Sequence, residues 1–250
     1  MRRGLLALIL LLGAGLARAE EPPHEIVLAA TETPFRQYSE NGQPAGYVVD
    51  VLQEAFSRTG HPVKIRFMPW ARCLAEAKAG TIDGVFGANR TPDRETDLLF
   101  SPEPLMDETQ SAFTRAEDQA QYSPTIAGLA DVRIGIINGS SIGAEFDRAI
   151  AEKKLHHIEV ASNFDSLLHM LAGRHVDVII ADSLSIRGMA KRDGTLRRLK
   201  ELPTPLLKGP IFVAFSRAHD LKDISRDFSI SLREMKKDGR YDAIFSKYFD

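Results

Sequence analysis

The chain has 250 residues, 44% of them hydrophobic and 26% charged, with 32 basic residues against 34 acidic ones. This balance, without any basic block, argues against a nucleic-acid partner or an anionic membrane surface. The one cysteine cannot form an internal disulfide, so a core of one large or two small domains must supply the stability.

The N-terminus is typical of a secretory signal peptide. Arg2 and Arg3 precede the uncharged stretch GLLALILLLGAGLA, which closes on ARA at 17–19. This apolar run is shorter than the ~20 residues of a membrane span, so cleavage after Ala19 is favoured over an anchor. Three arginines leave with residues 1–19, so 29 basic residues then face 34 acidic ones and the charge is about −5. We therefore expect a soluble, exported protein.

Strands and helices alternate in the first half of the expected mature chain. Apolar residues recur at helical spacing from Val48 to Phe56, and Gly60 stands where that helix should end. Alternation at this pace predicts a parallel α/β sheet. The predicted elements are a strand at 24–31, a turn-rich loop at 32–46, a helix at 47–60, a strand at 61–70, a helix at 71–80 and a strand at 81–88. Cys73 and Ala77 share one face of the 71–80 helix, so a buried free thiol is favoured over a nucleophile.

The pattern starts again after the polar, proline-containing stretch 114–130. Asn163 is suited to cap the second helix of this run. His156 and His157 have no carboxylate or thiol companions at ligand spacing, so they are interpreted as surface residues, and no metal site is expected. The predicted elements are a strand at 131–141 that enters a helix at 142–155, a strand at 156–162, a helix at 163–175 and a strand at 176–183. A second α/β lobe is implied.

The C-terminal part breaks this simple order. A strand is predicted at 210–217, and a long amphipathic helix followed by a shorter one is predicted within 221–250. If this tail packs on the first lobe, the chain crosses between lobes near 108–113 and near 208–213, which makes a hinge and a cleft. We expect the first lobe to comprise residues 20–111 and 210–250, and the second lobe residues 112–209.

Candidate ligand-binding residues follow the apolar strands, because ligands of open α/β sheets bind beyond the carboxyl ends of the strands. The planar guanidinium of Arg94 can donate two parallel hydrogen bonds to a ligand carboxylate. A local ion pair with Asp93, Glu95 or Asp97 is an equally good interpretation of this residue. The candidates, in chain order, are Glu32, Trp70, Arg72, Asn89 to Arg94, Gly139 to Ser141, and Asp182.

The candidates of the second lobe have two interpretations each. Ser140 and Ser141 lie where a strand enters a helix, so they suit an anion, yet capping of their own helix is the simpler account. Asp182 suits a ligand ammonium group, yet it could equally cap the helix that follows. Trp70 is either a wall of the site or part of the core, and Arg72 either faces the cleft or, more simply, the solvent. Together these residues match the two ends of a zwitterion.

Motifs of nucleotide binding and of hydrolase chemistry are absent from the sequence, and no cofactor is expected. The chain has no P-loop, no Gly-x-Gly-x-x-Gly, no Gly-x-Ser-x-Gly and no His-Glu-x-x-His.

Five stretches, in order and spacing, resemble the type II periplasmic solute-binding proteins of extracellular family 3, the receptors for polar amino acids in ABC importers. They are PFRQYSENGQPAGYVVDVLQEAF, AKAGTIDGVFGANRTPDRETDLLFSPEPL, IGIINGSSIGAEF, GRHVDVIIADS and EMKKDGRYDAIFSKYFD, and they cover essentially the whole expected mature chain. The resemblance implies a two-lobed α/β fold, with two sheets joined by a two-strand hinge and a ligand cleft between the lobes.

The resemblance also implies roles for the candidates. Arg94 is expected to bind the α-carboxylate with help from Ser140 and Ser141, and Asp182 to receive the α-ammonium. Asn89 and Trp70 fall where family members touch the ligand. Two departures are Glu32, at a position where several members carry an aromatic lid, and Gly87, at a position often held by Ser. Glu32 leads us to expect a preference for a cationic side chain.

Three functions are compatible with this scaffold. The first is a monomeric binding protein that captures a small amino acid-like ligand by hinge closure and delivers it to an inner-membrane ABC permease. The second is an enzyme, because the family resembles the periplasmic cyclohexadienyl dehydratases, but no dedicated acid–base pair stands out beside Glu32 or Asp182. The third is an orphan solute sensor that acts through a separate partner. The binding protein is favoured, and enzymatic activity is not expected.

Overall fold

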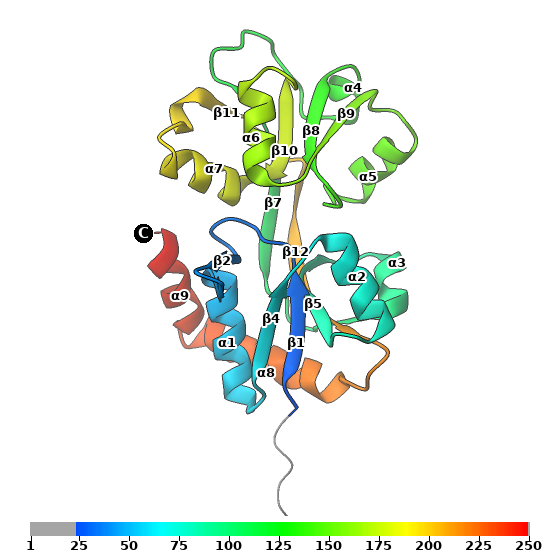
Figure 1. The fold of residues 1–250 in the computed structure, drawn as a ribbon, viewed down its shortest axis with the longest axis vertical. Coiled ribbons are helices and arrows are strands. Elements are labelled where there is room, and N and C mark those ends of the chain that lie inside the picture. Colours follow the sequence, from blue (N-terminus) through cyan, green and yellow to red (C-terminus); the bar gives the residue numbers. More distant parts are fainter. Residues whose placement is uncertain (1–23, 250) are drawn as a thin grey trace, which may run out of the picture.

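The computed structural model describes residues 24–249 and consists of two lobes stacked along the long axis (Figure 1). The predicted signal peptide at 1–19 lies outside the described residues. Within 24–249, no helix has both the length and the apolar character needed to cross a bilayer.

The first lobe follows the predicted alternation of strand and helix. Helix α1 ends as expected at Gly60, which adopts the left-handed conformation with φ 78° and donates its N–H to Ser57 O. The hairpin β2–β3 and the short helix α3 were not predicted. The elements are β1 (Ile26–Ala30), β2 (Tyr38–Glu40), β3 (Gln43–Ala45), α1 (Tyr47–Thr59), β4 (Val63–Phe67), α2 (Trp70–Ala79), β5 (Gly84–Asn89), α3 (Pro92–Asp97) and β6 (Leu98–Phe100).

The second lobe also contains the expected elements. Asn163 caps α6 as predicted, because its side chain accepts a hydrogen bond of 2.8 Å from Ser166 N. Helix α5 begins later than predicted, after a loop that ends at Gly143. The elements are α4 (Ile126–Leu129), β8 (Arg133–Ile137), α5 (Ala144–Ala151), β9 (His157–Ala161), α6 (Phe164–Ala172), β10 (Val178–Asp182), α7 (Ser183–Arg192), the 3₁₀ helix η1 (Leu196–Arg198) and β11 (Leu199–Glu201).

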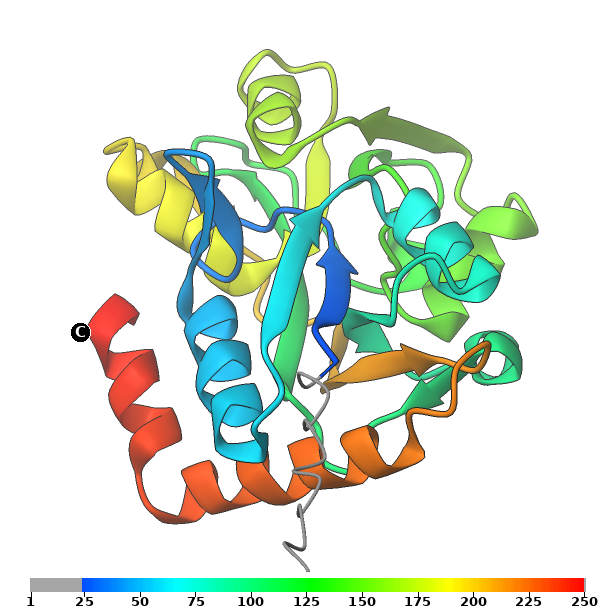
Figure 2. The same cartoon turned by 60° about the horizontal axis from the view of Figure 1, so that its bottom comes forward.

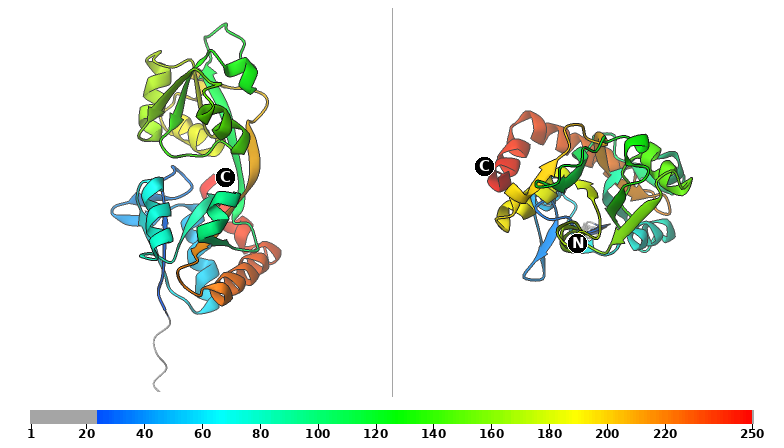
Figure 3. Two further views of the ribbon diagram at one scale, coloured as in Figure 1. Left: turned by 90° about the vertical axis from the view of Figure 1, so that its right-hand side faces the viewer. Right: turned by 90° about the horizontal axis from the view of Figure 1, so that it is seen from above.

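Two long strands join the lobes, as predicted. β7 (Met106–Arg115) and β12 (Leu207–Ser216) pair antiparallel from Leu207 with Gln110 to Ile211 with Met106. Seen from the side, they run together along one side of the molecule (Figure 3). The chain therefore crosses between lobes at the two places that the sequence indicated. The exact lobe limits, 20–111 with 210–250 and 112–209, stay predictions.

Hydrogen bonding links the strands more continuously than expected. Instead of two separate sheets, eight of the described strands form one path in the order β4-β1-β5-β12-β7-β10-β8-β9, which passes through the connecting pair. β6 and β11 pair beside this path, with β12 and β7, and β2 and β3 form a separate hairpin. The β5–β12 and β7–β10 pairs are antiparallel, so the sheet is mixed rather than parallel. The two-lobed α/β fold with a two-strand connection is confirmed.

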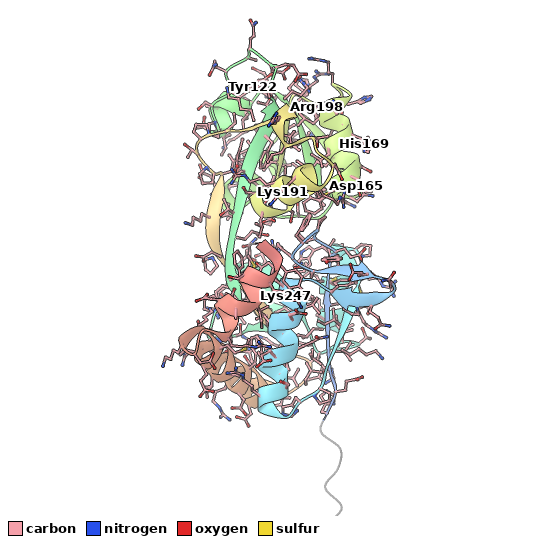
Figure 4. The ribbon with its side chains drawn as sticks, turned by 90° about the vertical axis from the view of Figure 1, so that its left-hand side faces the viewer. Tyr122, Asp165, His169, Lys191, Arg198 and Lys247 are labelled. Atoms are coloured by element: carbon pink, nitrogen blue, oxygen red, sulfur yellow. The ribbon has the colours of Figure 1, made fainter. Side chains whose placement is uncertain are left out.

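The C-terminal tail returns to the first lobe, where α8 (Lys222–Lys237) and α9 (Arg240–Phe249) pack against α1 (Figure 2). Lys247 lies on α9 facing α1, where its Nζ is 2.8 Å from Asp50 Oδ2 (Figure 4). Tyr248 OH donates to the same carboxylate at 2.9 Å. These contacts support the prediction that the tail belongs with the first lobe.

Each lobe has its own apolar core. Phe56, Phe215 and Phe228 pack together in the first lobe, with Phe56 and Phe228 stacked at 4.9 Å between ring centroids. Cys73 is fully buried in a second cluster of that lobe, which confirms the buried thiol. Among the described residues, none of the four buried clusters takes its buried members from both lobes. Between the lobes, the partly buried Leu184 of α7 packs against the first-lobe cluster, so relative motion of the lobes would open this edge contact but neither core.

Candidate ligand-binding site

A pocket lies between the two lobes, with an empty volume of about 710 Å³ that is partly open to solvent. Its walls come from the β1–β2 loop, the start of α2, the end of β5, α3, β7, the β8–α5 loop and the end of β10. Six predicted residues line it together, namely Trp70, Asn89, Arg94, Ser140, Ser141 and Asp182.

Arg94 lies in the first turn of α3. Thr91 caps this helix by accepting from Arg94 N at 3.4 Å, and Pro92 occupies the first helical position, where its missing N–H costs nothing. The guanidinium Nη1 donates to Asn89 O at 2.9 Å, and the group lies 5.4 Å from the centre of the Trp70 ring. Asn89, Trp70 and Arg94 thus form one wall of the pocket.

The alternative of a local ion pair for Arg94 is wrong. Glu95 pairs with Arg90 at 3.0 Å and Asp97 pairs with Lys78 at 2.9 Å, and within 24–249 Arg94 makes no ion pair. Burial lowers the pKa of Arg94, while Asp147 and Glu108 at longer range act in the opposite direction. A half-buried guanidinium at a pocket, without a carboxylate partner, is suited to an anionic group of a ligand.

Ser140 and Ser141 line the pocket, but they are not at a helix start. Ser140 Oγ donates to Ile137 O at 2.8 Å, and Ser141 Oγ donates to the Asp147 carboxylate, which also accepts from Ile142 N at 2.9 Å. Helix α5 begins only at Ala144. The expected anion site at a helix N-terminus is therefore wrong in this detail, because Asp147 already occupies donors of that loop.

Asp182 ends β10 and caps α7, so its capping interpretation is confirmed. Oδ1 accepts from Ser185 N at 2.9 Å and from Ser185 Oγ at 2.6 Å, and the residue is only 4% exposed. Oδ2 lies 3.4 Å from Arg36 Nη1. Burial raises the pKa of Asp182, and Arg36 opposes this rise. Any ligand ammonium group at Asp182 would have to share the carboxylate with Arg36.

Arg36, Gln37 and Glu108 are pocket residues that the sequence interpretation missed. Arg36 is the centre of this group. It is 2% exposed, and its Nη1 lies 2.5 Å from Glu108 Oε1 on β7, in addition to Asp182. Burial alone would lower the pKa of Arg36, but Asp182 and Glu108 hold it above its usual value. This ion cluster joins the first lobe, a connecting strand and the second lobe. The only available signal was an arginine within the loop after the first strand, where Glu32 was chosen instead.

Two predicted site residues lie elsewhere among the described residues. Glu32 does not line the pocket, because its Oε1 turns to the hairpin and accepts from Ser39 N at 2.7 Å. Arg72 lies on the solvent face of α2, 67% exposed, with its Nε 2.6 Å from Glu76 Oε1. The structure places neither residue in the pocket, so Glu32 gives no support for a cationic ligand side chain.

Metal ligands are not gathered anywhere in the part of the chain that the structure describes, where no group of three His, Cys, Asp or Glu side chains could hold an ion. His156 is exposed and its Nδ1 lies 2.8 Å from Asp131.

Related sequences match almost the whole chain. The lysine/arginine/ornithine-binding periplasmic protein of Escherichia coli (strain K12) is 25% identical over 272 residues, which cover 100% of this chain and 98% of the relative. The histidine-binding periplasmic protein of Salmonella typhimurium (strain LT2) is 21% identical over 253 residues, which cover 98% and 95%.

Solved structures confirm the two-lobed fold. An ancestral arginine-binding protein bound to arginine has a TM-score of 0.77 at 21% identity, covering 90% of this chain and 98% of that chain. An ancestral amino acid-binding protein described as a precursor of cyclohexadienyl dehydratase has a TM-score of 0.71 at 21% identity, covering 90% and 95%. Residues 25–250 match the family described as bacterial extracellular solute-binding proteins, family 3. The chain belongs to this family of solute-binding proteins.

Proposed function

We propose that this protein binds an amino acid or a related small zwitterion between its lobes and delivers it to an ABC importer. The observation that carries the proposal is the guanidinium of Arg94, which lines the pocket and makes no ion pair within 24–249. A ligand carboxylate can take two parallel hydrogen bonds from such a group. The relatives that bind histidine or lysine, arginine and ornithine support an amino acid as the ligand class.

The ammonium end of the ligand would lie at the ion cluster. Arg36 contributes one positive charge there, and Glu108 and Asp182 contribute two negative charges. The remaining negative charge suits an ammonium group, so we propose that Asp182 and Glu108 together bind the ammonium group of the ligand. Because Arg94 belongs to the first lobe and Asp182 to the second, both ends are held only when the lobes are close, and the ligand selects that state.

An enzymatic role is not part of the proposal. The likeness to the precursor of a dehydratase rests on fold, which does not decide function. A dehydratase needs an acid placed to protonate a leaving hydroxyl. Glu32 is outside the pocket, and Asp182 is engaged by Ser185 and Arg36.

We propose a monomeric periplasmic protein, exported by a cleaved signal peptide, with an inner-membrane permease as its partner.

A thermal-shift screen tests the function. The mature protein, unfolded and refolded to remove carried-over ligand, is mixed with the standard amino acids and with prephenate. A ligand at a hundred times its dissociation constant should stabilise the fold by about 2.7 kcal/mol. A shift with one amino acid or a few related ones is expected. No shift with any amino acid would overturn the proposal, and a shift with prephenate alone would favour the enzyme.

A further inference from the structure

Two neighbouring side chains of the pocket, Arg36 and Gln37, carry polar atoms without partners. Arg36 is 2% exposed and Gln37 is 3% exposed. Within 24–249, neither Arg36 Nε nor Gln37 Oε1 has a hydrogen-bond partner. Unsatisfied buried polar atoms are costly, and they are rare in folded proteins unless a ligand or water completes them. Both side chains line the pocket, so a ligand is the natural partner.

The orientation of the Gln37 amide is fixed by its neighbours. Gln37 Nε2 donates to Thr31 O at 3.3 Å and to Thr33 Oγ1 at 3.2 Å. A backbone carbonyl can only accept a hydrogen bond, so the nitrogen must face Thr31 and the oxygen is the unused end. Gln37 Oε1 can therefore accept a hydrogen bond from a donor group of a ligand.

The guanidinium of Arg36 has one edge in use and one edge open. Nη1 donates a hydrogen bond to Glu108 and forms an ion pair with Asp182, whereas Nη2 makes no hydrogen bond to any described residue. Gly87, with φ 73°, puts no side chain beside this edge, where a Cβ would lie 3.8 Å from Arg36 Nη2 and 3.8 Å from Gln37 Nε2. Elsewhere in the chain, Arg133 uses the equivalent Nε–Nη2 edge to hold Asp177. Arg36 Nε and Nη2 can therefore donate hydrogen bonds to an acceptor group of a ligand.

The charges of the pocket limit what that acceptor can be. Two arginines, Arg36 and Arg94, balance two carboxylates, Glu108 and Asp182. A zwitterion keeps this balance. A positively charged group at the end of the ligand side chain would be repelled by Arg36. A negatively charged group there would be repelled by the two carboxylates and by the unpaired oxygen of Gln37. A neutral group that both accepts and donates avoids both conflicts.

Resting on the proposed function, we infer that the ligand is an amino acid whose side chain ends in a neutral amide, either a carboxamide or a ureido group. Its carbonyl oxygen accepts from the Nε–Nη2 edge of Arg36, and its NH₂ donates to Gln37 Oε1. Gly87, which has no side chain, lies beside both residues.

Matched pairs of nearly isosteric ligands test this inference by calorimetry on the refolded mature protein. Glutamine is compared with glutamate, asparagine with aspartate, and citrulline with arginine. In at least one pair, the amide should bind at least tenfold more tightly than its charged counterpart, and no charged member should bind more tightly than the best amide. A charged amino acid that binds as tightly as the best amide would overturn the inference while leaving the proposed function intact. If no amino acid binds, the proposed function fails and the inference fails with it.

Arg36→Lys separates ligand recognition from a structural role. Lysine keeps a charge for Glu108 and Asp182 but lacks the Nε–Nη2 edge. The variant should lose about tenfold more affinity for the best amide ligand than for alanine, which has no distal polar group. Arg115→Lys is the matched control, because Arg115 is also buried, at 6% exposure, and ion-paired, to Asp118, but lies outside the pocket. Equal losses for alanine and for the amide would overturn the assignment of Arg36. If Arg36→Lys does not fold, the matched ligand pairs on the unmodified protein decide the question.

Discussion

The ring of Phe35, in the β1–β2 loop of the first lobe, lies directly against Gly188 on helix α7 of the second lobe. A Cβ on residue 188 would be only 2.6 Å from Phe35 Cδ2. Phe35 itself adopts a left-handed backbone conformation, with φ 66°. Beside it, Ser185 Oγ on α7 lies 3.0 Å from Pro34 O of the first lobe. The absence of a side chain at Gly188 therefore allows the lobes to approach at this edge of the pocket.

Gly188→Ala should weaken ligand binding without weakening the fold. The added methyl group overlaps the Phe35 ring, so the close approach of the lobes should cost about 1–3 kcal/mol, which is roughly 5–150-fold in affinity. Alanine is also a better helix former than glycine, so the free energy of unfolding of the ligand-free protein should not fall. Calorimetry and urea unfolding measure the two effects. Gly209→Ala is the control, because a Cβ there meets nothing within 4 Å, and equal affinities of the two variants would contradict the account.

Arg94→Ala should abolish most of the ligand affinity. Losing a charge-assisted pair with a carboxylate in a half-buried site costs about 2–5 kcal/mol, so the dissociation constant should rise at least thirtyfold. The neighbouring Arg90 is a matched control in the same segment, since it pairs with Glu95 and lies 5.3 Å from the rings of Phe100 and Phe212. Arg90→Ala should leave binding unchanged. Similar affinities for both variants would remove Arg94 from the site.

Trp70 should report binding by its fluorescence. It is the only tryptophan of the chain, it lies under the Arg94 guanidinium, and its Cβ would be 3.7 Å from a Cβ on Gly139 of the second lobe. A carboxylate on Arg94 and an approach of the lobes both change the surroundings of the indole. Titration with the ligand should change the emission with the same dissociation constant as calorimetry. A ligand that binds by calorimetry without any change in emission would place the site elsewhere.

Asp177 should make the stability of the second lobe depend on pH in acid. Its carboxylate accepts from Arg133 Nε at 2.9 Å and from Nη2 at 2.6 Å, and this pairing lowers the pKa of Asp177. A carboxylate whose pKa is lower in the folded than in the unfolded protein stabilises the fold at pH values above its unfolded pKa, which is about 3.9 for Asp. This stabilisation is lost as the pH falls through the pKa of the folded protein.

Asp177→Asn should therefore lower the free energy of unfolding by about 0.5–1 kcal/mol at pH 7, because Arg133 is half exposed, and by less at pH 3. Urea unfolding at both values measures the difference. Asp220→Asn, at an exposed position, is the control for the same change of side chain. A loss for Asp177→Asn that is equal at both pH values would mean that the ion pair is not its cause.

Local signals in the sequence predicted most of the fold. The apolar spacing of α1, its end at Gly60 and the cap at Asn163 are each decided by residues within one or two helical turns. Helix α3 was missed although Thr91 and Pro92 form a start signal, because six residues are too few to show an apolar period. The start of α5 was misplaced because Asp147, within the helix, holds the preceding loop.

The candidate site was predictable where a residue lies at the carboxyl end of a strand or within a few residues after it. Asn89, Arg94 and Asp182 were found by that rule. Arg36 escaped it, because its burial depends on Glu108, 72 residues further along the chain, and no local pattern distinguishes it from a surface arginine in a turn. Glu32 satisfied the same rule but turns to the hairpin, which shows that the rule gives a position and not a side-chain direction.

The central claim is that one ligand presents a carboxylate to Arg94 and an ammonium group to the cluster of Glu108, Asp182 and Arg36. The most direct measurement is calorimetric titration of the refolded protein with the amino acid that gives the largest thermal shift, and with its decarboxylated and deaminated analogues. The account predicts that removing either end lowers the affinity at least thirtyfold, because each end loses a charge-assisted contact. An analogue that lacks one end and still binds as tightly as the amino acid would contradict it.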